Sequence, residues 1–360
     1  MDTRRTRARR LPGARVSDGR VLDGHVRDGH VRAWLEIMRI SNLPTVLSNA
    51  IAGAALGLIV SSHDDSPRAL FTLLSPPLAY LGGMVLNDAF DAPTDHRERP
   101  HRPIPSGRIA RKHAFAAGFV LLALALAVAA VSSSLPALTA TAALVACIVF
   151  YDAIHQRAAA STLLLAFCRA LAAIVPMLAF AGNDWPTALS GGALVLPLAL
   201  AAWTLGLSIV ARGEMTAAAR TTSDPTRANP EQLRRRFISI GGFVAASIIF
   251  LAMDGLIRRG GVCAQLQFVE FAPDAMVSMS VVVSIVMVAL TMTLALVSNR
   301  GFRIIWNDQR ATPSAIGLWI ACLALIDAIA LAATGQLLLA GISVLLACTT
   351  RRMQRQIAGS

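Results

Sequence analysis

Charged side chains are scarce in this chain of 360 residues, and lysine is almost absent. Asp, Glu, Lys and Arg together make up 15% of the sequence against 55% hydrophobic residues, and Lys112 is the one lysine. This balance excludes an ordinary soluble domain. Apolar runs of roughly twenty residues recur along the chain, so we expect a polytopic α-helical membrane protein, because a helix needs about that length to cross hydrocarbon.

Cysteine is also sparse, and its positions show no pattern. The five cysteines have neither the spacing of metal ligands nor that of a disulfide framework. Four of them fall inside apolar runs, where we expect them to act as small packing residues. They are Cys147, Cys168, Cys263, Cys322 and Cys348.

The net charge of +12 is carried almost wholly by arginine. In a soluble protein such an excess would indicate nucleic acid as a partner. Here the arginines gather in alternate loops, and only Arg258 and Arg259 break the pattern. The positive-inside rule therefore places the N-terminus and these loops in the cytoplasm, and no nucleic-acid partner is expected. The basic segments are the N-terminal tail and residues 97–112, 212–236, 300–310 and 351–355.

Three regions are expected. Residues 1–32 carry three copies of a short Asp-Gly repeat that cannot bury a core, so they are interpreted as a disordered, Arg-rich cytoplasmic tail. Residues 33–350 form the transmembrane domain, and residues 351–360 form a basic cytoplasmic C-terminus. The Arg- and Ala-rich composition is typical of a bacterial chain, which favours the inner (cytoplasmic) membrane.

Nine apolar runs are long enough to span a membrane. A tenth, about Leu337–Cys348, is short for a full crossing and is either a further span or a re-entrant piece. The nine lie at about Trp34–Ser61, Leu70–Phe90, Ala110–Val131, Leu135–Ala153, Thr162–Ala181, Leu189–Val210, Phe237–Ile257, Met276–Val297 and Ser314–Ala333.

An acidic motif ends the second run. Asp88, Asp91 and Asp95 follow Asn87 at positions i, i+3 and i+7, which share one face of a helix. Pro93 leaves open whether Asp95 lies on the last helical turn or in the loop beyond. Oxygen ligands of this kind suit Mg²⁺ bound together with a substrate phosphate. The simpler interpretation is a solvated acidic loop.

The acidic motif and the Arg102–Ile109 segment (RPIPSGRI) resemble the first aspartate-rich motif of UbiA-type intramembrane prenyltransferases. Residues 39–49 resemble the first helix of that family, and the segments at Tyr151 and Arg169 resemble its fourth and fifth helix signatures. The resemblance covers most of residues 35–334.

This resemblance implies nine helices around a central cavity, with two aspartate-rich motifs that hold Mg²⁺ and a polyprenyl diphosphate. It implies catalytic and metal-binding roles for Asp88, Asp91 and Asp95, and binding of substrate in the cavity by Asn49, Tyr151 and Arg169. Concentrated negative charge on the leaving group must be neutralised before the allylic C–O bond ionises. The residues expected to contact the diphosphate are Asn87, Arg102, Arg108, Lys112 and Arg212.

The second motif departs from the family pattern. At the end of the sixth run, residues 211–214 read Ala-Arg-Gly-Glu, and Glu214 is the one carboxylate where the family has several aspartates. One interpretation is a divergent branch in which Arg212 replaces a metal and Glu214 holds the other. The opposing interpretation is that diphosphate chemistry is weakened or lost.

Two functions follow. The first is Mg²⁺-assisted transfer of a polyprenyl group from its diphosphate to a lipophilic, aromatic acceptor within membrane lipid. The alternative is a UbiA-like protein that binds or moves a small amphipathic molecule without prenyl transfer. Asp327, in the middle of the ninth run, is interpreted as a structural partner for another helix, because intramembrane charge is costly when unpaired.

Overall fold

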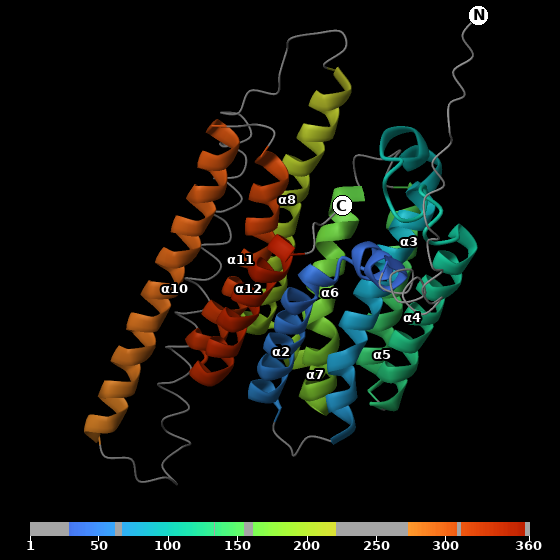
Figure 1. The fold of residues 1–360 in the computed structure, drawn as a ribbon. Coiled ribbons are helices and arrows are strands. Elements are labelled where there is room, and N and C mark those ends of the chain that lie inside the picture. The colour runs from blue at the N-terminus through green and yellow to red at the C-terminus, as the bar shows by residue number, and fades with distance from the viewer. Residues whose placement is uncertain are drawn as a thin grey trace, which may run out of the picture.

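The computed structural model describes residues 29–61, 67–132, 134–154, 161–220, 273–307 and 311–356, and every regular element within them is helical (Figure 1). The all-α membrane fold expected from the sequence is confirmed. The helices are α2 (Leu43–Val60), α3 (Ser75–Glu98), α4 (Arg111–Val131), α5 (Leu135–Ile154), α6 (Ser161–Ala181), α7 (Trp185–Ala188), α8 (Val195–Arg220), α10 (Pro273–Asn307), α11 (Thr312–Ala333) and α12 (Leu337–Gln356).

Eight helical stretches in the described residues are long and apolar enough to cross a membrane. They correspond to the first six, the eighth and the ninth predicted runs. The seventh run, about Phe237–Ile257, lies outside the described residues, as do residues 1–28 of the predicted tail, so the count of nine stays a prediction. The eight stretches are Ile40–Val60, Pro67–Glu98, Arg111–Val131, Leu135–Ile154, Ser161–Ala188, Gly192–Arg212, Val281–Asn307 and Thr312–Ala333.

Two of the long helices begin later in the structure than the approximate starts predicted for their apolar runs. The first run was expected to extend from about Trp34, but a helical segment ends at residue 37. A turn that contains Arg39 follows, and a 3₁₀ turn, Ile40–Asn42, leads into α2. The sixth run was expected to begin at Leu189, but the 3₁₀ turn Gly191–Leu194 delays α8 to Val195. In both places a short irregular piece precedes the long helix, and hydrophobicity alone does not reveal it.

The last apolar run opens a longer helix than expected. Helix α12 begins at Leu337, packs against α11 and α2, and continues through Arg351 and Arg352 to Gln356. It is not among the eight stretches, because its second half is polar. Residues 351–356, which were assigned to a separate basic C-terminus, therefore continue this helix.

The bundle is built around α6 and α11. Helix α6 packs against α2, α5 and α8, while α11 packs against α2, α8, α10 and α12. Helices α2 and α6 approach each other closely at Gly53 and Gly57, since a Cβ atom at Gly53 would lie 2.0 Å from the carbonyl oxygen of Ala173. Such small residues let helix backbones pack tightly in a membrane.

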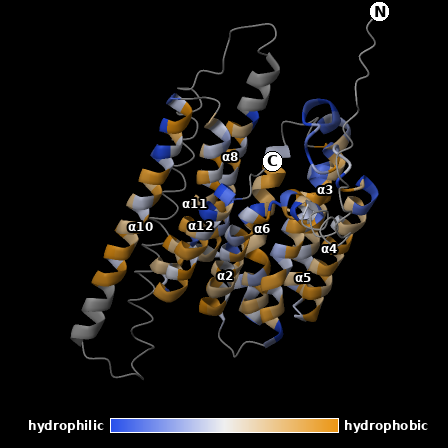
Figure 2. Cartoon of the chain, in the orientation of Figure 1, coloured by the Kyte–Doolittle hydropathy of each residue, from blue (hydrophilic) through white to orange (hydrophobic). Residues whose placement is uncertain are grey.

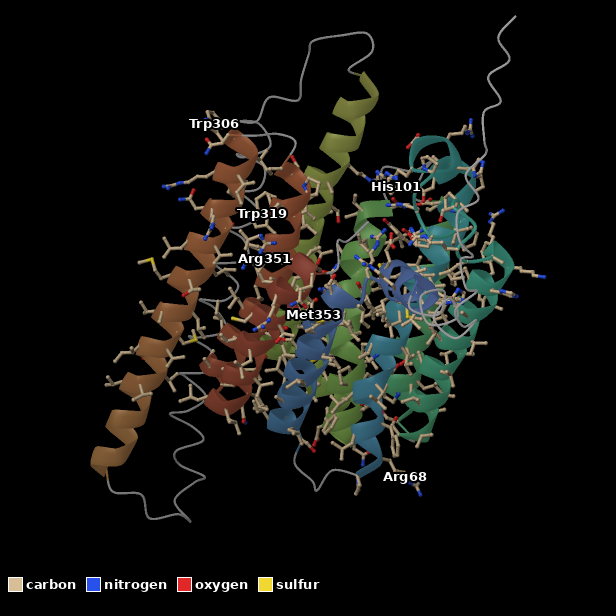
Figure 3. The ribbon with its side chains drawn as sticks, in the orientation of Figure 1. Arg68, His101, Trp306, Trp319, Arg351 and Met353 are labelled. Carbon is tan, nitrogen blue, oxygen red and sulfur yellow. The ribbon has the colours of Figure 1, made fainter. Side chains whose placement is uncertain are left out.

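Polar residues gather at the helix ends. Figure 2 shows hydrophobic residues along the helices and hydrophilic ones around the end of α3 and the start of α4. Figure 3 shows His101 and Trp306 toward one end of the bundle and Arg68 at the other. Two of the predicted basic loops thus lie toward the same end, as the positive-inside argument requires. Which side of the membrane that end faces stays a prediction.

Candidate functional site

Helix α3 carries the acidic motif and continues through Pro93 to Glu98. Asp95 therefore lies on the helix, which answers the question that the sequence left open. Asp88 and Asp95 are buried, with exposed fractions of 2% and 4%. They are not a solvated acidic loop, and two carboxylates this well buried require compensating charge.

Arg102, from the loop after α3, supplies part of that charge. Its Nη1 atom donates a hydrogen bond to Oδ2 of Asp95 at 2.7 Å and lies 3.8 Å from Oδ1 of Asp88. Arg102 is itself only 4% exposed. One buried guanidinium thus bridges the first and last carboxylates of the motif, with the short distance typical of a charge-assisted hydrogen bond.

Arg39 is the second cation of the site, and the sequence argument gave it no role. Its Nη2 atom donates to Oδ1 of Asp88 at 3.4 Å. Its backbone has the left-handed angles φ 44° and ψ 47°, and its carbonyl accepts a hydrogen bond from the Tyr80 hydroxyl at 3.1 Å. Burial is the largest single influence on the pKa of Arg39 and acts to lower it. Asp88, together with Tyr80, Tyr151 and Asp91, outweighs burial, so the pKa is raised and the guanidinium stays charged.

A strained backbone at a charged residue is a recurrent mark of functional sites. Arg39 is the one non-glycine residue with positive φ in the described part of the chain. From this position its side chain reaches Asp88 on α3. The signal available in the sequence was an arginine at a membrane end within the family-like segment 39–49.

Carboxylate and amide oxygens at the end of α3 fit a hard cation such as Mg²⁺. Oδ2 of Asp88 is buried and has no hydrogen-bond partner among the described residues, so one ligand oxygen is available. Within the described residues no three His, Cys, Asp or Glu side chains are gathered closely enough to hold a metal. Arg39 and Arg102 contact Asp88, and the partly exposed Asp91 on the same helix interacts electrostatically with both Asp88 and Arg39. The side chain of Glu214, the remaining predicted ligand, is outside the described set.

The other residues predicted to bind diphosphate are not all at this cluster. Arg108 is exposed, forms an ion pair with Glu36 at 3.1 Å and donates to the carbonyl of His101 at 2.8 Å. Lys112 is exposed at the start of α4. Asn87 is buried, and its amide donates to Oδ1 of Asp152 on α5 at 3.1 Å.

Deeper in the bundle, two predicted cavity residues contact other helices. Arg169 on α6 donates to the hydroxyl of Thr45 on α2 at 2.8 Å. Asn49 on α2 is fully buried and donates to both carboxylate oxygens of Asp327 on α11. Asp327 is therefore a structural partner for another helix, as expected.

The remaining two predicted residues lie near the same end. Tyr151 precedes Asp152 near the end of α5 and is partly exposed. Arg212 on α8 donates through Nη2 to the hydroxyl of Ser161, the first residue of α6. Arg212 therefore joins the end of α8 to the start of α6.

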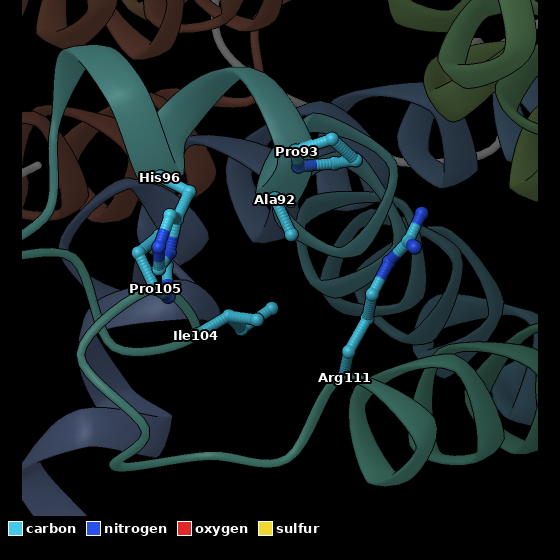
Figure 4. A pocket seen from close by; sticks show the side chains of 6 residues that line it. All are labelled: Ala92, Pro93, His96, Ile104, Pro105 and Arg111. Atoms are coloured by element: carbon cyan, nitrogen blue, oxygen red, sulfur yellow. The ribbon is translucent and has the colours of Figure 1, made fainter.

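A pocket of about 380 Å³ opens beside the acidic motif (Figure 4). It lies between the end of α3, the loop that follows and the first residue of α4. Its wall is apolar except for two basic side chains. The lining residues are Ala92, Pro93, His96, Ile104, Pro105 and Arg111.

Comparison with known proteins identifies the family. The model of the UbiA prenyltransferase family matches residues 46–315, which is three quarters of the chain. The chain belongs to the UbiA prenyltransferase family. The resemblance inferred from the acidic motif and its basic neighbour is thereby confirmed.

Curated relatives of this UbiA family member match over shorter segments. The digeranylgeranylglyceryl phosphate synthase of Saccharolobus solfataricus is 28% identical over 156 residues, which are 43% of this chain and 54% of that protein. The synthase of the same name from Korarchaeum cryptofilum is 38% identical over 82 residues, 23% of this chain and 28% of that protein. The chain thus spans about half the length, or less, of these relatives.

A solved structure confirms the fold. The UbiA homologue from Archaeoglobus fulgidus bound to GPP and Mg²⁺ superposes with a TM-score of 0.52 at 16% identity, covering 84% of this chain and 99% of that one. At this identity the likeness establishes a UbiA-type helical bundle.

Proposed function

We propose that this protein transfers a polyprenyl group from its diphosphate to a lipophilic acceptor in the membrane. The observation that carries the proposal is the cluster at the end of α3, where Arg102 bridges Asp88 and Asp95 and Arg39 contacts Asp88. Membership of the UbiA prenyltransferase family supports it. In this reaction the allylic C–O bond breaks, the diphosphate leaves with the electron pair, and the acceptor forms the new bond and releases a proton.

Asp88, Asp91 and Asp95, with Glu214 from the second motif, are the residues that would hold Mg²⁺. Bound there, the metal supplies positive charge to the leaving diphosphate. The homologue from Archaeoglobus fulgidus was solved with Mg²⁺ and GPP, which supports divalent metal use.

Arg39 and Arg102 are the cations that the chain itself provides. Both contact Asp88, and both have a buried Nε atom with no hydrogen-bond partner among the described residues. A guanidinium with a spare donor can bind a phosphate oxygen while keeping its carboxylate contact. We propose that the two arginines stabilise the departing diphosphate in this way.

The other predicted substrate residues would have the roles that the resemblance implies. Arg212 would bind the diphosphate from the end of α8, and Asn87 from α3. Tyr151, Arg169 and Asn49 would bind substrate in the cavity. Arg108 and Lys112 are exposed, so they would contact the diphosphate only as it enters.

The acceptor is proposed as lipophilic, and the aromatic acceptor stays a prediction. The curated relatives are named digeranylgeranylglyceryl phosphate synthases, which indicates a second acceptor class, a glyceryl phosphate that carries an isoprenoid. Assays with purified protein, one prenyl diphosphate donor and each acceptor class in turn would separate the two.

The depleted second motif favours the alternative function, in which an amphipathic molecule is bound or moved without prenyl transfer. Calorimetric titration with a non-hydrolysable geranyl diphosphate analogue, at several Mg²⁺ concentrations, separates the two functions. We expect Mg²⁺-dependent binding that Asp91→Ala abolishes. Glu98→Ala, which removes an exposed carboxylate from the same helix, is the matched control and should bind like wild type. Wild-type protein that binds no prenyl diphosphate of any length, with or without Mg²⁺, would exclude the transferase.

A further inference from the structure

Pro93 interrupts the hydrogen bonding of α3 in the middle of the acidic motif. Proline has no N–H, so the carbonyl four residues earlier, that of Ala89, loses its helical donor. Ala89 is fully buried. A buried carbonyl without a partner is costly, and α3 nevertheless continues for five residues beyond Pro93 to Glu98.

Arg111, the first residue of α4, replaces the missing donor. Its Nε atom donates to the carbonyl oxygen of Ala89 at 2.8 Å. Its guanidinium carbon lies 5.2 Å from the ring centroid of Phe115, one turn further along α4, which holds the group in place. Figure 4 shows Arg111 reaching from the start of α4 toward the turn of α3 that carries Ala92 and Pro93.

The position of this contact is what connects it to the site. Asp88 and Asp91 lie before Pro93 and Asp95 lies after it, while Arg102 contacts both Asp88 and Asp95. Any change in the direction of α3 at Pro93 would move Asp95 relative to the other two carboxylates.

We propose that Arg111 is a positioning residue for the acidic motif. By occupying the Ala89 carbonyl, it lets α3 pass through Pro93 and keeps Asp95 in register with Asp88 and Asp91. It acts on the backbone of α3 and not on substrate. The part of this inference that concerns ligand binding rests on the proposed function, and the part that concerns the helix does not.

A double-mutant cycle tests the inference, because Pro93→Ala restores the N–H that the Ala89 carbonyl lacks. Wild type, Arg111→Gln, Pro93→Ala and the double variant are compared. One readout is the unfolding temperature in detergent, and the other is the Mg²⁺ concentration that half-saturates binding of the geranyl diphosphate analogue.

In the Pro93 background, Arg111→Gln should lower the unfolding temperature and raise the required Mg²⁺ concentration by about tenfold, the loss expected for one hydrogen bond from a charged donor. In the Pro93→Ala background, Arg111→Gln should lower the unfolding temperature by much less, and it should change the required Mg²⁺ concentration by less than about twofold. Arg111→Lys should restore part of the loss. Arg97→Gln removes an exposed arginine from the last turn of α3 and should change neither readout.

Equal effects of Arg111→Gln in the two backgrounds would overturn the proposal, since the contact with Ala89 would then be irrelevant. A fall in unfolding temperature with an unchanged Mg²⁺ requirement would leave Arg111 a merely structural residue and would also overturn it. Should Arg111→Gln not fold, recovery of folded protein in the double variant supports the inference, and continued failure refutes it. If wild type binds no prenyl diphosphate, the proposed function fails, while the unfolding temperatures still decide the role of Arg111 in α3.

Discussion

The side-chain amide of Asn49 on α2 donates hydrogen bonds to both carboxylate oxygens of Asp327 on α11, at 2.7 and 3.0 Å. The two residues are 278 positions apart in the chain, and neither is exposed. They connect the first and the last of the candidate membrane spans in the described part of the chain. In hydrocarbon a polar side chain finds its partner on another helix, so this pair fixes the two helices relative to each other.

Replacing one residue of this pair should therefore lower the free energy of unfolding more than replacing both. We expect Asn49→Leu to destabilise the protein by about 1–3 kcal/mol, because Asp327 loses its donor inside the bundle. Asn49→Leu combined with Asp327→Leu should recover part of that loss. Thermal unfolding in detergent measures both, with Asn307→Leu at the exposed end of α10 as the matched control. A double variant less stable than the sum of the singles would contradict the pairing.

The contact of α2 with α6 gives a second prediction. A Cβ atom at Gly53 would meet the backbone of Ala173 at 2.0 Å, whereas one at Gly341 on α12 would meet nothing within 4 Å. Gly53→Ala should destabilise the protein by about 1–3 kcal/mol through overpacking. Gly341→Ala should be neutral or slightly stabilising, because alanine favours a helix interior. Similar unfolding temperatures for the two variants would contradict this account of the packing.

The sequence predicted the helices far better than their junctions. A membrane span appears in the sequence as about twenty consecutive apolar residues. The predicted ends of α4, α5, α6 and α11 therefore agree with the structure within a residue or two. The break at Arg39 depends on a left-handed backbone, an ion pair with Asp88 and a hydrogen bond from Tyr80. None of these leaves a pattern in hydrophobicity.

The candidate site was likewise predictable only where its residues lie close together in the sequence. The acidic motif and Arg102 lie close in sequence, and the structure pairs them. That Asn87 meets Asp152, or that Arg111 meets Ala89, depends on how separate helices pack, which spacing along one chain does not encode. The roles of Arg108 and Lys112 were inferred from proximity in sequence, and the structure leaves both exposed.

Replacing Arg102 with alanine should destabilise the protein more than the same replacement of Arg108. Arg102→Ala leaves Asp88 and Asp95 buried without their shared cation, and removal of one partner from a buried ion pair costs about 3–5 kcal/mol. Arg108→Ala breaks an exposed pair with Glu36, and such pairs contribute about 1 kcal/mol or less. Unfolding temperatures in detergent compare the two variants. Equal destabilisation would show that Arg102 is not the buried counter-charge of the motif.

Opposite ends of the bundle should be accessible from opposite sides of the membrane. With all five native cysteines replaced, Ser106→Cys lies in the exposed loop after α3, and Arg68→Cys lies at the other end (Figure 3). A membrane-impermeant thiol reagent should label Ser106→Cys from the cytoplasm and Arg68→Cys from the outside. Cytoplasmic labelling of both, or the reverse pattern, would overturn the orientation inferred from the arginines.

The second motif yields the last prediction, because Arg212 and Glu214 are assigned different tasks. Arg212→Ala should weaken binding of the geranyl diphosphate analogue by about ten- to hundredfold and leave its Mg²⁺ dependence in place, since arginine binds phosphate but not metal. Glu214→Ala should instead raise the Mg²⁺ concentration needed for binding, as expected on removal of a metal-ligand oxygen. Titration calorimetry at several Mg²⁺ concentrations measures both, with Arg355→Ala at the exposed end of α12 as control. The double variant should match the product of the single effects within about twofold. Strong non-additivity would mean that Glu214 only holds Arg212 in place and binds no metal.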